Sequence, residues 1–368
     1  KKWCFGVSLS DDQLILHITT LCVLCELRLI NKPDYAVGAC YNGMLHRAKL
    51  PHIAKLASAL IRWDRRNAHL LLTEEYAQDL LPKWLLDMFH CDRKYHDAIA
   101  QQHLQPAPID IFVKQGTIVQ AADAVPLEFS GSYRLAGDVD IARLSGYDAG
   151  EFWVQDVAAT LPVRLANPQA GMRVLDMCAA PGGKTMQLAN MGCEVTALDS
   201  SRSRLKQLHE NLRRTNHTAK VICADALDYE CDALFDMVLL DAPCSATGTI
   251  RRHPELPWSK SQATITALPK LQLSLLLRAA QLLKPRGWLV YCVCSLLHYE
   301  SDAVIAAFLA ATGDQFLLSP ITRESHAGLS SLPKRVFGPR GTLQTDPAVW
   351  AEIGGMDGFY CAILQKNA

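Results

Sequence analysis

The chain has 368 residues, of which 49% are hydrophobic and 20% charged, and its 37 basic and 37 acidic side chains cancel to a net charge of zero. These values exclude wholesale disorder, which requires low hydrophobicity and high net charge, and they exclude a globally basic nucleic-acid binder. A chain of this length is expected to form two or three domains. Any basic surface must therefore be local and balanced by acidic side chains elsewhere.

Thirteen cysteines are spread along the chain, mostly within apolar runs. An odd number at irregular spacing argues against a disulfide framework and predicts buried free thiols in a reducing, cytoplasmic compartment. Cys22 and Cys25 have the spacing of a zinc-ligand pair, but no second pair follows, so we expect packed thiols and no metal. The other thiols expected to be buried in apolar runs are Cys178, Cys193 and Cys223.

Residues 1–66 are predicted to be helical, because apolar residues recur at three- and four-residue steps. Leu14–Ile30 is the most apolar stretch. It is too short and too charged to span a bilayer, so we expect a buried helix and no membrane association. The chain begins with Lys1 rather than Met, and we expect further residues to precede it.

Residues 67–150 have a mixed pattern that predicts a small α+β linking domain. Trp84–Phe89 follows a proline and begins a short helix, and Ile109–Val113 has the composition of a strand. The glycine-containing stretch 130–150 predicts turns and short strands.

Residues 151–368 alternate between short buried strands and helices, which predicts a doubly wound, Rossmann-like α/β sheet. Arg202–Thr215 is one predicted helix. Pro269–Leu283 is another, with its proline in the first turn, where proline is tolerated. The predicted strands are Val174–Met177, Glu194–Leu198, Val221–Cys223, Met237–Leu240 and Trp288–Cys292.

A small-residue turn, Cys178–Thr185, follows the first of these strands. Small residues let the backbone approach a ligand, and a helix N-terminus offers free N–H groups. The turn is not a phosphate loop, because Cys178 stands where that motif requires glycine. Asp199, at the end of the next strand, could bind two ribose hydroxyls, and Asp225, after the third, could accept from an adenine amino group. These contacts favour adenosylmethionine as the ligand; the alternative is an ordinary α/β turn with solvated acidic residues.

Two later strands each end beside a cysteine, Cys244 after Asp241 and Cys294 before Ser295. Strand carboxyl ends face the ligand crevice in such sheets. A thiolate that adds to C6 of cytosine makes C5 nucleophilic enough to accept a methyl group, and Asp241 could hold or protonate N3. This chemistry requires no metal. These residues alone leave open which cysteine attacks, and buried packing is the alternative role for either thiol.

Together these motifs resemble the Sun/Fmu family of RNA cytosine-C5 methyltransferases over residues 151–366. The run 249–255 is similar to the bacterial RsmB type, which methylates one cytosine in 16S ribosomal RNA. The resemblance implies a class I methyltransferase domain with a seven-stranded, mostly parallel sheet at 151–368. It also implies an RNA-binding role for 67–150 and a partial NusB-like helical domain at 1–66, whose last helix would be Leu56–Arg62.

The resemblance also implies roles for individual residues. Cys294 would be the nucleophile, Cys244 would release the enzyme–RNA adduct, and Asp241 would complete the catalytic group. Arg251, Arg252 and His253 are expected to contact phosphates around a flipped cytosine, with a solvated basic loop as the alternative. The cofactor contacts implied for adenosylmethionine are Cys178, Ala179, Ala180, Pro181, Gly182, Gly183, Lys184, Asp199, Arg204, Asp225 and Asp241.

These residues are also compatible with three other functions. The same chemistry could act on transfer RNA or another ribosomal site. A non-catalytic RNA-binding assembly factor would keep the pocket but would need neither Cys244 nor Cys294. A DNA cytosine methyltransferase would use Cys244 as its nucleophile. We expect the protein to be a monomer.

Overall fold

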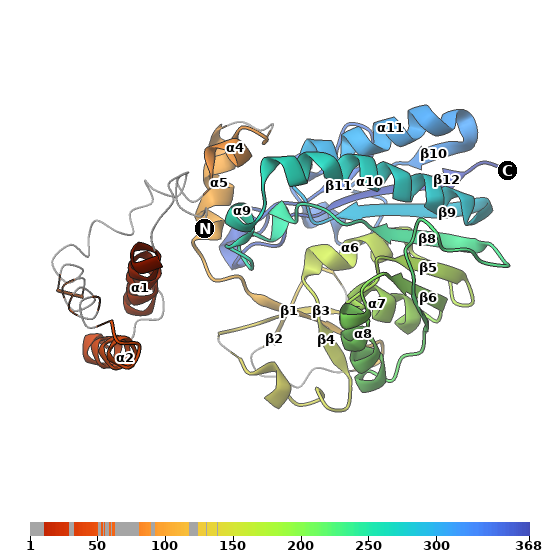
Figure 1. Ribbon diagram of the computed structural model, residues 1–368. Helices are drawn as coiled ribbons and strands as arrows, with labels where there is room; N and C mark the ends of the chain where they lie inside the picture. Colours follow the sequence, from red (N-terminus) through yellow and green to blue (C-terminus); the bar gives the residue numbers. More distant parts are fainter. Residues whose placement is uncertain are drawn as a thin grey trace. The chain divides into compact units, whose positions relative to one another are not determined.

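The chain divides into two compact units, Lys1–Ala77 and Gln78–Ala368, in the computed structural model shown in Figure 1. No helix within the described ranges is long and apolar enough to cross a membrane. The structure describes residues 11–28, 33–50, 53, 55, 59, 61–62, 81–89, 93–117, 124–129, 131–137 and 139–368.

The first unit contains two helices, α1 (Asp11–Arg28) and α2 (Asp34–Arg47), in the part that the apolar spacing predicts to be helical. Val23 and Leu27, one turn apart on α1, are buried against apolar side chains of α2. Most of the segment 56–62 lies outside the described residues. The likeness of this unit to NusB therefore stays a prediction.

The cysteines are less buried than their apolar surroundings predict. Cys193 is buried and Cys178 is half-buried, but Cys22, Cys25 and Cys223 are exposed. For these three the prediction is wrong. Cys22 and Cys25 are exposed because they do not share the face of α1 that carries Val23 and Leu27, and an apolar run on a helix buries only one stripe.

A four-stranded antiparallel sheet, in the order β2-β3-β1-β4, forms part of the second unit. β1 is Ile109–Val113, as predicted, and it pairs with β4 (Phe152–Val154) through the register Phe112↔Trp153. The predicted domain boundary between residues 150 and 151 separates β4 from the other three strands of this sheet. No local feature of the sequence indicates that β1 pairs with β4. The remaining elements of this region are α4 (Lys83–Leu86), α5 (Arg93–His103), β2 (Ala124–Pro126), β3 (Ser132–Leu135) and η3 (Ile141–Arg143).

The larger sheet confirms the predicted class of fold. Its seven main strands have the order β10-β12-β9-β8-β5-β6-β7, and an eighth, β11, pairs with β12. β5 to β9 are parallel, whereas β12 is antiparallel to both its neighbours β9 and β10. The strands are β5 (Arg173–Met177), β6 (Glu194–Asp199), β7 (Lys220–Cys223), β8 (Phe235–Asp241), β9 (Leu283–Val293), β10 (Phe316–Ser319), β11 (Leu343–Gln344) and β12 (Tyr360–Lys366).

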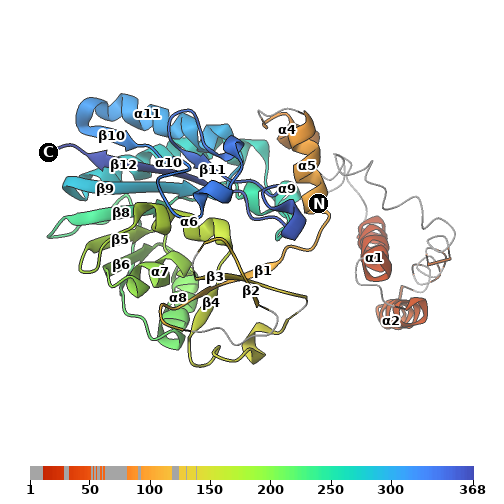
Figure 2. The same ribbon diagram turned by 180° about the vertical axis from the view of Figure 1, so that it is seen from behind.

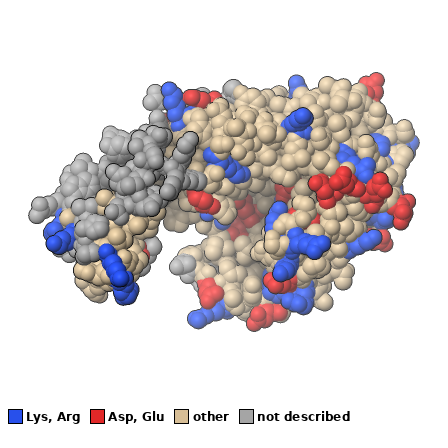
Figure 3. Space-filling model, in the orientation of Figure 1, with Lys and Arg blue, Asp and Glu red and all other residues tan. Residues whose placement is uncertain are grey.

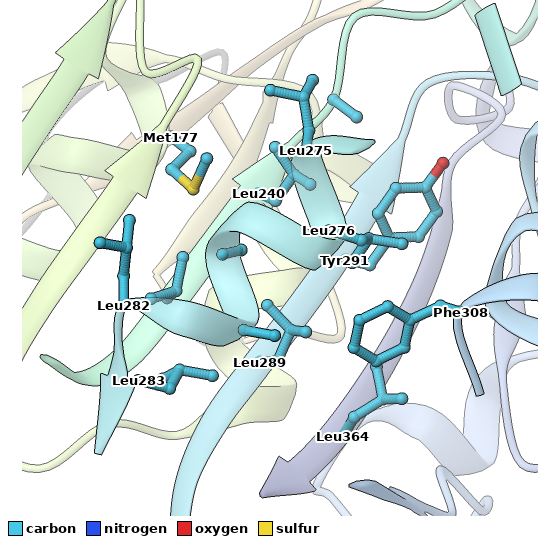
Figure 4. Packing of buried hydrophobic residues seen from close by; sticks show 14 of the residues in the cluster. Met177, Leu240, Leu275, Leu276, Leu282, Leu283, Leu289, Tyr291, Phe308 and Leu364 are labelled. Atoms are coloured by element: carbon cyan, nitrogen blue, oxygen red, sulfur yellow. The ribbon is translucent and has the colours of Figure 1, made fainter. Parts of the chain in front are cut away.

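Helices cover both faces of this sheet, as Figures 1 and 2 show. The alternation of side chains along β8 explains the two cores: Leu240 belongs to the core that also contains residues of α10 and α11, while Leu239 belongs to the core that contains residues of α6. Figure 4 shows the first of these cores around Tyr291 and Phe308. The helices are α6 (Val157–Ala166), α7 (Gly183–Asn190), α8 (Arg202–Arg214), α9 (Leu256–Ser259), α10 (Gln262–Gln281) and α11 (Asp302–Thr312), with short 3₁₀ turns at η4 (Thr247–Thr249), η5 (His298–Glu300), η6 (Gly313–Gln315), η7 (Leu329–Ser331), η8 (Lys334–Val336) and η9 (Ala351–Ile353).

The long helix α10 starts earlier than predicted. Ser261 is its N-cap and accepts a hydrogen bond from the backbone N–H of Thr264, so Pro269 lies inside the helix and not in its first turn. The N-cap serine satisfies a free N–H group at the helix start, and this local bond fixes the boundary more strongly than the proline does.

The order of the strands creates a crevice. The chain passes from β5 outward to β6 and β7 and then returns to the other side of β5 as β8. Loops that leave β5 and β8 therefore diverge at the carboxyl edge of the sheet, where open α/β sheets bind their ligands.

Candidate active site

The loop after β5 is built for close approach to a ligand. Gly182 has φ +104°, a left-handed conformation that glycine adopts without strain, and it directly precedes α7. The backbone N–H of Ala179 donates to the carbonyl of Leu198 at the end of β6 (3.0 Å). This part of the prediction, a small-residue turn between a strand and a helix, is confirmed.

Asp199 lies directly behind this loop. One carboxylate oxygen accepts from the backbone N–H of Ala180 (3.1 Å), the other from that of Ser201 (2.9 Å), and the side chain is 2% exposed. Arg204 also contacts Asp199 (3.5 Å) and donates to the carbonyl of Ala180. Asp199 and Arg204 therefore shape the loop, while Asp225 lies exposed after β7, where it accepts from the backbone N–H of Leu227.

A cavity of about 590 Å³ opens beside the loop. Figure 3 shows this side of the molecule, where a recess with acidic side chains separates upper and lower parts of the surface. The walls come from both sheets, and α8 contributes polar side chains. The lining residues used below are Ala179, Ala180, Pro181, Gly183, Lys184, Asp176, Asp241, Asp156, Arg252, Asp357, Trp153, Gln207 and Asn211.

Three charged side chains meet at the inner end of this cavity. Lys184 is nearly buried, and its Nζ donates to Asp241 Oδ2 (2.8 Å). Burial alone would lower the pKa of Lys184, but the neighbouring Asp241 carboxylate outweighs it and the pKa is raised. Asp176 is fully buried, and burial raises its pKa to about 7. The Asp176 carboxyl accepts from Thr185 Oγ1 (2.6 Å) through Oδ2, while its Oδ1 is buried with no hydrogen-bond partner within the described ranges.

Asp176 is a site residue that the sequence analysis missed. An unsatisfied carboxylate oxygen in a buried position is costly, and it marks a place where a positively charged ligand group would be stabilised. The available signal was an acidic residue inside an otherwise apolar strand, immediately before the small-residue loop. A ligand that carries an amino or sulfonium group, as adenosylmethionine does, fits this position.

The two cysteines predicted to meet at adjacent strand ends do so. Cys244 follows β8 and Cys294 follows β9, and their sulfurs lie 3.5 Å apart. Hydrogen bonding with Cys294, together with burial, raises the pKa of the Cys244 thiol well above its usual range. The backbone N–H of Gly248 donates to the carbonyl of Cys294 (3.0 Å) and so joins the loop after β8 to the one after β9.

The basic loop after Cys244 is only partly available to RNA. Arg251 is 1% exposed; it donates to Asp357 through Nε (2.8 Å) and to Asp156 through Nη2 (3.0 Å). The expectation that Arg251 contacts a phosphate is at odds with this burial, because its guanidinium holds two carboxylates together. Arg252 binds the same carboxylates but is 25% exposed and lines the cavity, and His253 is 59% exposed.

Known proteins match this chain along most of its length. The model of the family described as 16S rRNA methyltransferase RsmB/F matches residues 163–365. Ribosomal RNA small subunit methyltransferase B of Vibrio cholerae is 34% identical over 98% of this chain and 84% of its own length. The protein of the same name from Vibrio vulnificus is 32% identical over 98% of this chain and 85% of its own length.

Two solved structures from Pyrococcus horikoshii show the same fold. A methyltransferase homologue has a TM-score of 0.64 at 24% identity, covering 80% of this chain and 100% of that one. NSun6 has a TM-score of 0.63 at 16% identity, covering 80% of this chain and 97% of that one. From the family match and the curated relatives, we conclude that this chain belongs to the RsmB/F family of 16S rRNA methyltransferases.

Proposed function

We propose that this protein transfers a methyl group from adenosylmethionine to C5 of a cytosine in 16S ribosomal RNA, through a covalent bond between Cys294 and C6. The observation that carries the proposal is the pair of thiols at the ends of β8 and β9, 3.5 Å apart. Asp241, at the end of β8, lines the cavity. Cys244 and Cys294 are not among the residues that line this cavity. A binding protein without this chemistry has no use for two thiols that face each other.

The cofactor would be held by residues on the loop after β5 and on the neighbouring strand ends. Asp176 has a buried oxygen free for a cationic group, and Lys184 and Asp241 form an ion pair beside it. When bound, adenosylmethionine supplies the electrophilic methyl group that C5 accepts. The complete proposed set is Cys178, Ala179, Ala180, Pro181, Gly182, Gly183, Lys184, Asp176, Asp199, Arg204, Asp225 and Asp241.

Cys294 is the nucleophile in this proposal. The pKa of Cys244 is raised, so Cys244 keeps its proton and its S–H can donate a hydrogen bond to the Cys294 sulfur (3.5 Å). The proton of the attacking Cys294 thiol passes to solvent. As the bond from Cys294 Sγ to C6 forms, the electron pair of the C5=C6 bond moves toward C5. Asp241 would hold a proton at N3: its Oδ2 accepts from Lys184, and among the described residues its Oδ1 accepts only the long hydrogen bond of the Cys292 thiol (3.7 Å).

Cys244 is assigned to release of the adduct. A base must take the proton from C5 after methylation, so that its electron pair reforms the C5=C6 bond and Cys294 leaves as a thiolate. Cys244 first loses its own proton to solvent and then takes the proton from C5. Because the pKa of Cys244 is raised, its thiolate is a strong base but a rare species at neutral pH. Release is therefore expected to become faster as the pH rises.

RNA is proposed to approach through the cavity. Arg252 is 25% exposed and lines the cavity, the exposed His253 directly follows it, and Ile141 and Tyr147 of residues 67–150 line the same cavity. These positions support a role in RNA binding for residues 67–150, the predicted linking domain. The protein is proposed to act as a cytoplasmic monomer.

The test is nucleoside analysis of unmodified 16S RNA after incubation with the protein and adenosylmethionine. The proposal predicts 5-methylcytidine in 16S RNA and little in transfer RNA or duplex DNA. A methyl group found only on transfer RNA would mean that the same chemistry acts on transfer RNA and not on 16S RNA. A product in duplex DNA would favour the DNA-type alternative, and absence of methyl transfer to any nucleic acid would contradict the proposal.

A further inference from the structure

A fully buried carboxylate lies behind the two thiols. Glu300, in η5 after β9, is 0% exposed. Its Oε1 accepts from the backbone N–H of Ser245 (2.9 Å) and from Gln272 Nε2 (3.0 Å). Its Oε2 accepts from the hydroxyl of Ser295 (2.5 Å). The proposed reaction assigns this group no chemical step, and it does not line the cavity.

The donors to Glu300 belong to the two catalytic loops. Ser245 directly follows Cys244, and Ser295 directly follows Cys294. The two serine hydroxyls also lie 3.0 Å apart. One carboxylate therefore holds the residues next to both thiols, one through each of its oxygens.

Gln272 of α10 extends this connection. Besides its bond to Glu300, its Nε2 donates to the carbonyl of Pro243, the residue before Cys244 (2.9 Å). Lys260 holds the same loop from another side, by donating to the carbonyls of Cys244 (3.0 Å) and Ser245 (2.7 Å). The loop that carries Cys244 is thus fixed on both sides of its thiol.

A buried carboxylate is an expensive way to fill space, since a hydrophobic side chain of similar size avoids the cost of desolvation. What the carboxylate adds is short, directional, charge-assisted hydrogen bonds. We propose that Glu300 is a positioning residue that fixes the separation of the Cys244 and Cys294 sulfurs by binding the residue after each thiol. The role of Glu300 in adduct release rests on the proposed function. Its role in fixing the distance between the two sulfurs does not.

The spacing is measured directly by oxidation. Diamide converts two thiols to a disulfide: it takes up two electrons and two protons and becomes a hydrazide. The sulfurs are 3.5 Å apart and must close to about 2.05 Å, a small movement only if the loops are held together. The rate at which the Cys244–Cys294 disulfide forms, followed by mass spectrometry of unreduced peptides, therefore reports how the thiols are positioned.

The main variant is Glu300→Gln, which keeps the size of the side chain but replaces one acceptor by a donor. The Ser295 hydroxyl and the amide must then rearrange, and we expect disulfide formation to slow by about tenfold. Adduct release should slow more than adduct formation, because release requires both thiols. The matched control, Glu194→Gln, alters an exposed acid at the start of β6 and should leave both rates unchanged.

Ser295→Ala is the second variant, and it keeps the experiment decisive if Glu300→Gln fails to fold. It removes only the hydroxyl, which donates to Oε2, lies near the hydroxyls of Ser245 and Thr247, and accepts from the backbone N–H of Leu297. It should also slow disulfide formation. Wild-type oxidation rates in a folded Glu300→Gln protein, or in Ser295→Ala if that alone folds, would overturn the inference. If oxidation slows in the variants while the wild type methylates no RNA, the proposed function fails and the positioning role stands.

Discussion

Replacing Arg251 by methionine distinguishes a structural ion pair from an RNA contact. The Arg251 side chain is 1% exposed and makes three hydrogen bonds: to Asp357, to Asp156 and to the carbonyl of Gly354 (2.7 Å). In Arg251→Met, only Arg252 would remain to neutralise the two buried carboxylates. Removing one partner of a buried ion pair costs about 3 to 5 kcal/mol. For a unit of the size of Gln78–Ala368, the expected fall in Tm is roughly 5 to 8 °C.

The loss of stability should depend on pH in a defined direction. Burial raises the pKa of Asp357 to about 6. A carboxyl with a raised pKa in the folded state favours folding when protonated, and this contribution is lost as the pH rises through about 6. The difference in Tm between wild type and Arg251→Met should therefore shrink below pH 6, where Asp357 takes up a proton.

Differential scanning calorimetry at pH 5 and pH 8 measures both effects, with His253→Ala as the control on an exposed neighbour. The reasoning is refuted if Arg251→Met keeps the wild-type Tm but binds RNA more weakly. In that case the slope of the logarithm of the RNA-binding constant against the logarithm of salt concentration would fall by about one phosphate contact. That result would make Arg251 an RNA ligand and not a structural residue.

Two further predictions concern the cofactor loop and the catalytic loops. Binding of adenosylmethionine near pH 6.5 should release protons, because a cationic ligand favours the ionised form of Asp176, whose pKa is about 7; calorimetry in buffers of different ionisation enthalpy measures this. Asp176→Asn should abolish the release, and a wild-type binding enthalpy that is independent of buffer would contradict the role of Asp176. Gly248→Ala should reduce methyl transfer by about tenfold or more, because the new Cβ would lie 2.0 Å from the Gly358 carbonyl oxygen and the loop that binds Cys294 must shift. Gly43→Ala, on α2, is the control and should leave activity intact, so equal activity in both variants would show that the loop tolerates the shift.

The local structures around the site that were predicted correctly are those with a local signature. Cys178–Lys184 combines small residues with the end of a buried strand, and such a pattern depends on few distant contacts. Cys244 and Cys294 could be paired because each follows a predicted parallel strand, and parallel strands place their carboxyl ends at one edge. Only the adjacency of β8 and β9 had to be assumed.

The parts that were missed depend on contacts between distant segments. Asp156 and Asp357 are 201 residues apart, and nothing local indicates that they enclose Arg251. The pairing of β4 with β1 likewise crosses the predicted domain boundary. Glu300 lies in an ordinary polar stretch, and only the folded chain brings it to both cysteine loops. Such pairings are set by tertiary structure, which local propensity does not encode.

The covalent role of Cys294 is the central claim, and trapping the protein–RNA adduct tests it most directly. Wild type, Cys294→Ala and Cys244→Ala are incubated with adenosylmethionine and unmodified 16S RNA and run on a denaturing gel. We predict that Cys294→Ala is inactive and forms no adduct, while Cys244→Ala accumulates one. An adduct that persists in Cys294→Ala and disappears in Cys244→Ala would contradict the account and assign the attack to Cys244.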